Sequence, residues 1–204
     1  MNRRDSLTRA VVLSAVVILS LYSSPGDAAD PQPVVVLVAY HSATGNTEKM
    51  AQAVAEGAKA VSGTSVVLKR VGEVIAADLL SSDAVVVGSP VYFGNMSGEV
   101  KTFFDNWALK FAFPFQERKM RNKVGAAFAT GASFSNGKEV TILTILGAML
   151  INQMIVISGG GGFGASATTG PGSPGIDAKE IAEARALGTR VAEVAVLVKR
   201  GSGK

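Results

Sequence analysis

Val34-Val35-Val36-Leu37-Val38-Ala39-Tyr40 is a continuously apolar, largely β-branched run, and Ser42-Ala43-Thr44-Gly45-Asn46-Thr47 follows it after one residue. An unbroken apolar run of this length is typical of a strand buried on both faces of a parallel sheet. Beyond the short polar stretch, apolar residues recur at helical spacing, at Met50, Val54, Ala58 and Val61. This spacing predicts an amphipathic helix. The segment therefore predicts a strand, a tight loop and a helix in that order.

The loop Ser42–Thr47 combines small hydroxyl side chains with the start of a helix. The first N–H groups of a helix have no acceptor within the helix, and the helix dipole favours negative charge there. The loop contains no Lys, and the absence of G-x-x-x-x-G-K argues against a nucleoside-triphosphate P-loop. We predict that the loop holds one terminal phosphate through uncharged donors. The alternative, on this segment alone, is an ordinary capped helix after a strand.

Composition limits the other possibilities. The chain has 204 residues, 48% of them hydrophobic and 18% charged, which fits one well-buried domain. It has no Cys and a single His, so disulfides, thiolate catalysis and multi-His metal sites are excluded, and we expect no metal. The net charge is only +4, and the basic residues of 118–123 and 199–200 are interpreted as solvated surface. Nucleic acid is therefore not expected as a partner.

The N-terminus has the pattern of a secretory signal peptide, which we assign to residues 1–28. Three Arg residues precede an apolar stretch at 10–22, and Gly26-Asp27-Ala28 provides a small-x-small cleavage site. Arg3-Arg4-Asp5-Ser6-Leu7 resembles a twin-arginine export signal, with Ser6 where that signal prefers Phe. We expect export, most simply to the periplasm, and membrane contact only through this segment. The alternative is an uncleaved inner-membrane anchor, although a span needs about 20 apolar residues.

The rest of the chain alternates strands with helices. After a linker at 29–33, strands are predicted at 34–40, 65–71, 84–87, 124–129 and 154–157. Helices are predicted after the first strand, at 97–110, at 138–151, and from Asp177 to about residue 199, while 72–80 is a short connecting segment. Asp177 and Glu180 have the spacing of a capping box. This pattern predicts an α/β fold, a doubly wound five-stranded parallel sheet of order 2-1-3-4-5 with helices on both faces. The domain spans 34–199 and a basic tail spans 200–204.

Three loops should meet at the carboxyl edge of such a sheet: 42–47, 88–96 and 130–137. The second and third combine Gly, small hydroxyl residues and aromatics. Glycine lets backbone amides approach a planar polar heterocycle closely, and an aromatic ring can lie against its face. Together, the loops predict one ligand crevice.

The motifs in these loops resemble a known family. Ser42–Thr47 is similar to the FMN phosphate loop of flavodoxins, and Gly88-Ser89-Pro90 with 93–98 and 101–105 resembles the WrbA-type NAD(P)H:quinone oxidoreductases. The similarity covers about 34–199 and implies a flavodoxin-like fold that binds FMN. It implies phosphate contacts from Ser42, Ala43, Thr44, Gly45, Asn46 and Thr47. Residues bordering the isoalloxazine would be Pro90, Val91, Tyr92, Phe93, Gly94 and Asn95. Residues closing over the pyrimidine and ribityl side would be Thr130, Gly131, Ala132, Ser133 and Asn136.

The resemblance also implies an activity: transfer of two electrons from NAD(P)H to a quinone or similar planar acceptor, in a homo-oligomer, either a dimer or a tetramer. No catalytic side chain is expected, because the flavin carries the chemistry. One alternative is a flavodoxin-type one-electron carrier, but such carriers are typically acidic and this chain is net positive. A second alternative is a binding module without flavin.

The chain departs from the family pattern at several places. Relatives often place a His over the flavin, whereas the only His here, His41, ends the first strand. Trp107, Phe111, Phe113 and Phe115 replace a Gly-rich stretch, and either pack a helix and a subunit contact or cover a neighbouring flavin. The 72–80 connection is short, and an export signal is unusual in a family that is ordinarily cytoplasmic.

One glycine motif is set aside. Gly159–Gly164 satisfies G-x-G-x-x-G, but the dinucleotide fingerprint must open a helix, and the residues that follow do not form one. We interpret it as a loop that interrupts the last strand, which resumes at Ala165–Thr168.

Overall fold

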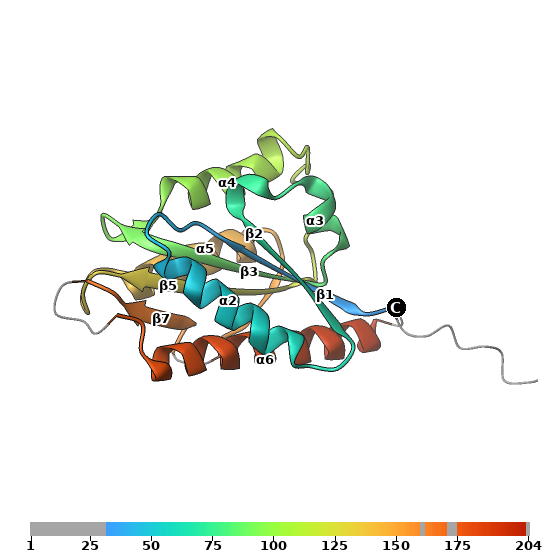
Figure 1. Ribbon diagram of the computed structural model, residues 1–204. Coiled ribbons are helices and arrows are strands. Elements are labelled where there is room, and N and C mark those ends of the chain that lie inside the picture. Colours follow the sequence, from blue (N-terminus) through green and yellow to red (C-terminus); the bar gives the residue numbers. More distant parts are fainter. Residues whose placement is uncertain (1–31, 160–161, 171–174, 203–204) are drawn as a thin grey trace, which may run out of the picture. The chain divides into compact units, whose positions relative to one another are not determined.

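The computed structural model describes residues 32–159, 162–170 and 175–202. Pro33–Lys204 form one compact unit, and Figure 1 shows its sheet with helices on both sides. The predicted signal peptide and residues 29–31 of the predicted linker lie outside the described residues. Within the described part, no helix combines the length and apolar character needed to cross a bilayer.

The elements follow the predicted alternation. The strands are β1 (Val34–Tyr40), β2 (Thr64–Arg70), β3 (Ala84–Tyr92), β4 (Asn95–Met96), β5 (Val124–Gly131), β6 (Ile155–Val156) and β7 (Ala165–Thr168). The helices are α2 (Asn46–Lys59), the short 3-10 helix η1 (Val71–Glu73), α3 (Ala76–Ser81), α4 (Gly98–Leu109), α5 (Lys138–Ile151) and α6 (Ala178–Gly201).

The main sheet is parallel and has the order β2-β1-β3-β5-β6. The predicted flavodoxin-like order is therefore confirmed. Its last position is shared: β6 pairs with the start of β5 (Val124 with Ile155) and β7 with its end (Phe128 with Ala165). The Gly-rich loop thus interrupts the edge strand, and β7 resumes it at Ala165–Thr168, as predicted.

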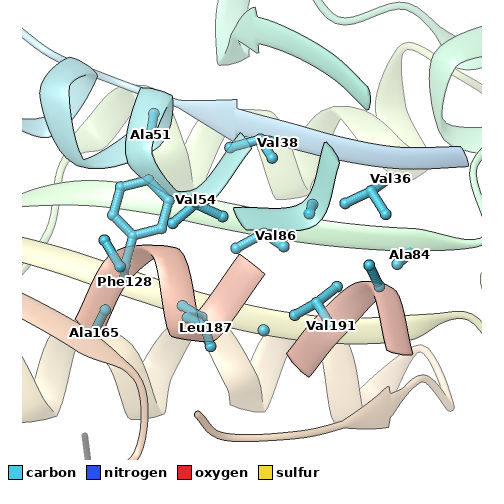
Figure 2. Packing of buried hydrophobic residues seen from close by; sticks show 14 of the residues in the cluster. Val36, Val38, Ala51, Val54, Ala84, Val86, Phe128, Ala165, Leu187 and Val191 are labelled. Carbon is cyan, nitrogen blue, oxygen red and sulfur yellow. The ribbon is translucent and has the colours of Figure 1, made fainter. Parts of the chain in front are cut away.

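Side chains of β1 point alternately to the two faces of the sheet and contribute to both layers of the core. Val36 and Val38 belong to the cluster under α2 and α6, where Leu187 is buried with them (Figure 2). Leu37 and Ala39 point to the other face and join the cluster formed with α3, α4 and α5. A strand buried on both faces explains why its sequence is continuously apolar.

Helices α2 and α6 touch backbone to backbone. A Cβ on Gly57 would lie 2.0 Å from the Arg185 carbonyl oxygen, and one on Gly188 would lie 1.9 Å from the Val54 carbonyl oxygen. The Thr189 hydroxyl donates to the Gly57 carbonyl at 3.0 Å. This close crossing fixes the axis of α2, and therefore the position of its N-terminus at the carboxyl edge.

Three predicted segments differ from the structure. The 72–80 segment, predicted only as a short connection, contains most of η1 and the helix α3. At the start of α3, Asp78 accepts hydrogen bonds from the Ile75 N–H and, at 2.8 Å, from the Lys69 ammonium. Strand β3 continues through Tyr92, five residues beyond the predicted end, and turns back into β4. The segment 88–96 is therefore largely a β-hairpin, with the turn at 93–94. The predicted strand 154–157 is reduced to Ile155–Val156.

Candidate functional site

The first loop leads into a helix whose first backbone donors have no acceptor within the helix. Helix α2 has Gly45 as its N-cap at φ 86°, and no side chain caps it. The first helical bond is Lys49 N–H to the Gly45 carbonyl, at 3.0 Å. The N–H groups of Asn46, Thr47 and Glu48 therefore have no acceptor within the helix. The Ser42 hydroxyl accepts from the Gly45 N–H at 3.1 Å and closes the loop around this end of the helix.

A charged pair lies behind the loop. Glu48, in the first turn of α2, would repel an anion, but Arg70 donates to its carboxylate at 2.7 Å. Arg70 also donates to the Ser42 carbonyl at 2.8 Å, and the Tyr40 hydroxyl donates to the other Glu48 oxygen at 2.9 Å. Burial, and then the hydrogen bond to Glu48, raise the pKa of the Tyr40 phenol, which therefore stays a donor. Sequence reasoning missed this set because the pairing of Tyr40 with Arg70 depends on sheet register.

The first and third loops are directly joined. The Thr47 hydroxyl lies 2.8 Å from the Thr130 hydroxyl, and both residues are buried. Thr47 is at the start of α2 and Thr130 is near the end of β5. The sequence predicted that both loops face one crevice, and this contact brings them together.

The second loop is a tight hairpin with a strained tip. Tyr92 pairs with Asn95, and the turn residues Phe93 and Gly94 have φ of 49° and 80°. A non-glycine residue in this region costs about 1–3 kcal/mol. The Phe93 side chain is nonetheless completely exposed. The Thr144 hydroxyl of α5 donates to the Asn95 side-chain oxygen at 2.7 Å, which ties the hairpin to the helix.

A serine pair connects the hairpin to His41 at the end of β1. The Ser97 N–H donates to the Ser89 hydroxyl at 2.9 Å, and the Ser97 hydroxyl caps α4 by accepting from the Val100 N–H. His41 Nδ1 lies 2.9 Å from the same Ser97 hydroxyl. His41 therefore positions the end of β1 against the start of α4.

The third loop is closed by a lysine that sequence reasoning did not select. Lys138 is 4% exposed, and its ammonium donates to the Ser133 carbonyl at 2.7 Å and to the Thr168 hydroxyl at 2.9 Å. Within the loop, the Asn136 amide satisfies its neighbours when its oxygen faces the Ala132 N–H at 2.9 Å and its nitrogen faces the Ser133 carbonyl at 3.1 Å, which is the orientation we assign. A Lys in the first turn of a helix gives no local sign of burial, so only the fold reveals this contact.

The aromatic residues at the end of α4 and just after it differ in burial. Trp107 is 2% exposed and packs against Phe103 and Phe104, with ring centroids 5.6 and 5.1 Å apart. Its buried indole N–H has no hydrogen-bond partner among the described residues. Of the other three aromatic residues named from the sequence, Phe113 is buried, Phe111 is partly buried and Phe115 is exposed. Trp107 is therefore part of the core and is not placed to cover a neighbouring flavin.

Comparison with known proteins agrees with this arrangement. Residues 33–168 match the model of the NADPH-dependent FMN reductase family. The chain belongs to this family. It is 34% identical over 194 residues to a NAD(P)H dehydrogenase (quinone) of Archaeoglobus fulgidus, with 78% of this chain and 96% of that protein covered. A protein of the same name from Acidithiobacillus ferrooxidans is 33% identical over 195 residues, with 78% and 96% covered.

Solved structures show the same fold. A flavodoxin, WrbA-like protein from Agrobacterium tumefaciens superposes with a TM-score of 0.67 at 28% identity, covering 80% of this chain and 98% of that one. An archaeal flavodoxin superposes with a TM-score of 0.63 at 22% identity, covering 80% and 99%, which supports the fold alone.

Proposed function

We propose that this protein is an FMN-dependent oxidoreductase that passes two electrons from NAD(P)H to a quinone or a similar planar acceptor. The observation that carries the proposal is the uncapped start of α2, where three backbone N–H groups lack helical acceptors beside a loop of small hydroxyl residues. Membership of the FMN reductase family and relatives named NAD(P)H dehydrogenase (quinone) support the same function.

The donor set fits a phosphate ester. Ser42, Thr44, Asn46 and Thr47 supply neutral donors at the positive end of the helix dipole, and a Cβ on Gly45 would meet no atom within 4 Å. Arg70 balances the nearby Glu48 carboxylate, so the loop presents no net repulsion to an anion. The complete proposed phosphate set is Ser42, Ala43, Thr44, Gly45, Asn46 and Thr47.

The other two loops would hold the ring system. Pro90 to Asn95 border the ring, and the hairpin is kept in place by Ser97 and Thr144. Thr130 to Asn136 close over the pyrimidine and ribityl side, and Lys138 holds that loop in shape. Bound FMN supplies the two-electron redox chemistry, and the protein supplies binding, orientation and shielding from water.

Two exposed aromatic rings belong to loops that are proposed to hold the flavin. Phe93 and Phe134 are exposed and belong to the hairpin and the third loop, respectively. Rings of this kind favour stacking with planar molecules. A nicotinamide and a quinone would therefore bind in turn on the same open face, with no side-chain acid or base required.

Purification with a visible spectrum, followed by steady-state assays, tests the proposal. The expected result is flavin absorbance, or uptake of added FMN, with turnover of NADH or NADPH by benzoquinone. A stable semiquinone without turnover would instead support a one-electron carrier. Protein that neither contains nor takes up FMN would support a flavin-free binding module and contradict the proposal.

The protein is further proposed to form a homo-oligomer, a dimer or a tetramer, through α5. This helix is rich in apolar residues and leaves Val140, Leu143, Leu150 and Ile151 exposed. Exposed apolar surface on one helix is typical of an interface. Light scattering after size exclusion tests this point: a monomeric mass across micromolar concentrations would contradict it.

Export of the protein is also proposed, on the basis of the N-terminal sequence, with an uncleaved inner-membrane anchor as the alternative. Mass spectrometry of protein from separated cell fractions tests this. Recovery of a full-length chain from the cytoplasm alone would contradict both alternatives, export with cleavage and an uncleaved inner-membrane anchor.

A further inference from the structure

Lys138 is a buried cation whose hydrogen-bond partners are all neutral. The residue is 4% exposed. Its ammonium donates to the Ser133 carbonyl at 2.7 Å, to the Phe134 carbonyl at 3.4 Å and to the Thr168 hydroxyl at 2.9 Å. Among the described residues, this ammonium forms no ion pair with a carboxylate. Lysine is almost never fully buried unless it is paired. Carbonyls orient an ammonium group but do not neutralise it, so a positive charge lies under the third loop.

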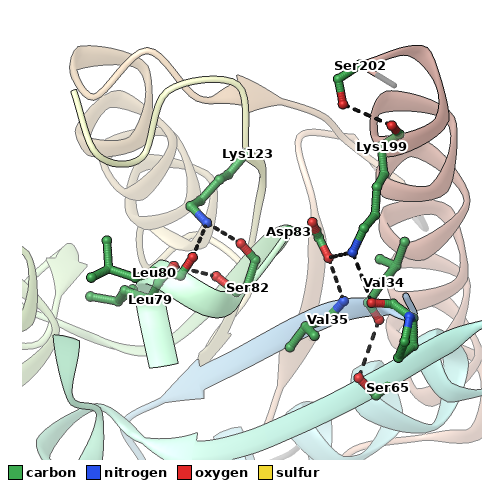
Figure 3. A network of polar contacts seen from close by, with 11 residues as sticks. Val34, Val35, Ser65, Leu79, Leu80, Ser82, Asp83, Lys123, Lys199 and Ser202 are labelled. Atoms are coloured by element: carbon green, nitrogen blue, oxygen red, sulfur yellow. Dashed lines mark hydrogen bonds and ion pairs between the residues drawn. The ribbon is translucent and has the colours of Figure 1, made fainter. Parts of the chain in front are cut away.

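Two less buried lysines of the same domain show the usual arrangement. The Lys199 ammonium lies 3.0 Å from the Asp83 carboxylate, as Figure 3 shows. The Lys69 ammonium lies 2.8 Å from the Asp78 carboxylate. A carboxylate compensates an ammonium group for part of the hydration that it loses on burial. Lys138 is more deeply buried than either lysine and has no such compensation in the described part of the chain.

The charged groups closest to Lys138 do not offset its charge. Glu180 of α6 joins the network only through the backbone, since it accepts from the Thr168 N–H at 2.8 Å. Glu139 follows Lys138 on α5 and is exposed. Helix α5 starts after Gly137, at φ 99°, without a side-chain cap. The positive end of the helix dipole therefore adds to the charge of the buried ammonium, and this corner of the domain favours a negative ligand group.

Lys138 also sets the direction of two peptide groups. In a trans peptide, the C=O and the N–H of one unit point in opposite directions. The Ser133 and Phe134 carbonyls turn inward to Lys138, so the N–H groups of Phe134 and Ser135 point away from it. Neither N–H has an acceptor among the described residues, and both residues are exposed. Successive backbone N–H groups that point the same way form sites for negative charge.

This part of the third loop lies where the loops of the proposed crevice meet. A Cβ on Gly137 would lie 2.6 Å from the Gly94 carbonyl oxygen, so the tip of the hairpin packs on the start of α5. The contact between Thr130 and Thr47 joins the same loop to the start of α2. The buried cation and the two outward N–H groups therefore belong to the corner of the crevice that is proposed to hold the pyrimidine side of the flavin.

We propose that Lys138 is a positioning residue that makes this corner bind the reduced flavin more tightly than the oxidised flavin. The inference rests on the proposed function. When NAD(P)H donates a hydride, the nicotinamide C4–H bond breaks, an N–H bond forms on the flavin ring, and the ring gains one negative charge. Lys138 stabilises this charge through its own field and through the Phe134 and Ser135 N–H groups that it turns toward the ligand. It neither donates nor accepts a proton.

The reduction potential of bound FMN tests the proposal, because it compares the affinities for the reduced and oxidised flavin. Lys138→Met removes the charge and keeps a side chain of similar length. Quenching of FMN fluorescence measures the Kd of the oxidised form, and anaerobic titration against a redox dye measures the potential. The ratio of reduced to oxidised affinity should fall at least about tenfold in Lys138→Met, which lowers the two-electron potential by about 30 mV.

The pH dependence of the potential separates this electrostatic role from a merely structural one. An anionic reduced ring takes up one proton per two electrons, and the potential then falls by about 30 mV per pH unit. A neutral reduced ring takes up two protons, and the slope is about 59 mV per pH unit. The pH at which the slope changes should lie about one pH unit higher in Lys138→Met, because the anionic ring loses a tenfold stabilisation.

Lys179→Met is the matched control. Lys179 is an exposed lysine in the first turn of α6, where water screens its charge, so the affinity ratio should stay within about twofold of wild type. An unchanged ratio in Lys138→Met, or an equal fall in the control, would overturn the proposal. Equal weakening of the oxidised and reduced forms would also overturn it, since Lys138 would then only hold the loop in shape.

Failure of this inference can be told apart from failure of the proposed function. A wild-type protein that binds no FMN would contradict the function itself. A wild-type protein that binds FMN and turns over, but whose affinity ratio does not depend on Lys138, would contradict the inference alone. Circular dichroism checks that the variants fold, and Lys138→Gln, with the same expected fall in the ratio, serves if Lys138→Met unfolds.

Discussion

The hydroxyl of Thr47 lies 2.8 Å from the hydroxyl of Thr130, although 83 residues separate them. Both side chains are buried, so the contact joins the start of α2 to the end of β5 inside the proposed crevice. Each hydroxyl has one proton and two lone pairs, so the pair can bond mutually and still offer a donor to a third group. The loops for the phosphate and for the pyrimidine side are thus positioned relative to each other before any ligand binds.

Replacing Arg70 should weaken FMN binding. Arg70→Met leaves the Glu48 carboxylate unneutralised beside the phosphate loop, and leaves the Ser42 carbonyl without its donor. Because the Arg70 side chain is 43% exposed, the expected loss is modest, about five- to tenfold in Kd, or roughly 1 kcal/mol. Titration of the quenching of FMN fluorescence measures it.

The second-site variant Glu48→Gln supplies the control for this effect. In the Arg70→Met background it removes the repulsive carboxylate, so FMN affinity should return towards the wild-type value. An Arg70→Met protein that binds FMN as tightly as wild type would show that the pair has no role in the phosphate site.

Phe93→Asn should stabilise the fold and reduce the activity. Phe93 has φ 49° and precedes Gly94 in a two-residue hairpin turn, where Asn-Gly is strongly preferred. The free energy of unfolding should rise by about 1 kcal/mol. The value of kcat/KM for benzoquinone should fall several-fold because an exposed stacking ring is lost. Urea unfolding and steady-state kinetics measure the two effects, and a rise in both quantities would contradict the assigned role of Phe93.

Gly188→Ala should destabilise the protein even though Ala is the better helix former. The added methyl would meet the Val54 carbonyl oxygen at 1.9 Å and force α2 and α6 apart, at a cost of about 1–3 kcal/mol. Gly147→Ala in α5 is the matched control, since its methyl would meet no atom within 4 Å. The Gly147→Ala substitution should raise the free energy of unfolding by up to about 1 kcal/mol. Equal effects of the two substitutions on the urea midpoint would exclude the close crossing.

Asp78→Asn should reduce stability in a pH-dependent way. Burial raises the pKa of the Asp78 carboxyl, but the Ile75 N–H and the Lys69 ammonium outweigh it, and the net pKa lies below 3.8. The carboxylate therefore stabilises the fold fully above the pKa of the unfolded chain, and loses this effect as the pH falls through the folded pKa. At pH 7 the free energy of unfolding of the wild-type protein should exceed that of the variant by about 1 kcal/mol. Urea denaturation at a series of acidic pH values should show the difference shrinking as the pH falls below 3.8, whereas a constant difference would contradict the ion pair.

The sequence predicted the parts of the fold that local pattern determines. The apolar run 34–40, the helix 138–151 and the interrupted last strand all appear where they were expected. Helix α3 was missed because six residues are too few for a clear amphipathic period. The continuation of β3 into a hairpin was missed because Gly and Pro residues in that segment are also typical of loops.

The contacts behind the proposed site could not be predicted in the same way. Arg70 reaches Glu48 only because β2 lies beside β1 in a particular register, and Lys138 reaches Thr168 only because β7 pairs with β5. Such pairings are set by tertiary structure, so residues with unremarkable local sequence become structural supports of the loops. The loops were predicted from the sequence, but these supports required the fold.

The central claim is that the start of α2 binds a phosphate, and the affinity for FMN compared with riboflavin tests it most directly. The two ligands share the ring system and differ by the phosphate ester. We predict that riboflavin binds at least about a hundredfold more weakly than FMN to the wild-type protein. Thr47→Glu should abolish this preference, because its carboxylate repels the ester. Equal affinity of the wild-type protein for the two ligands would contradict the account.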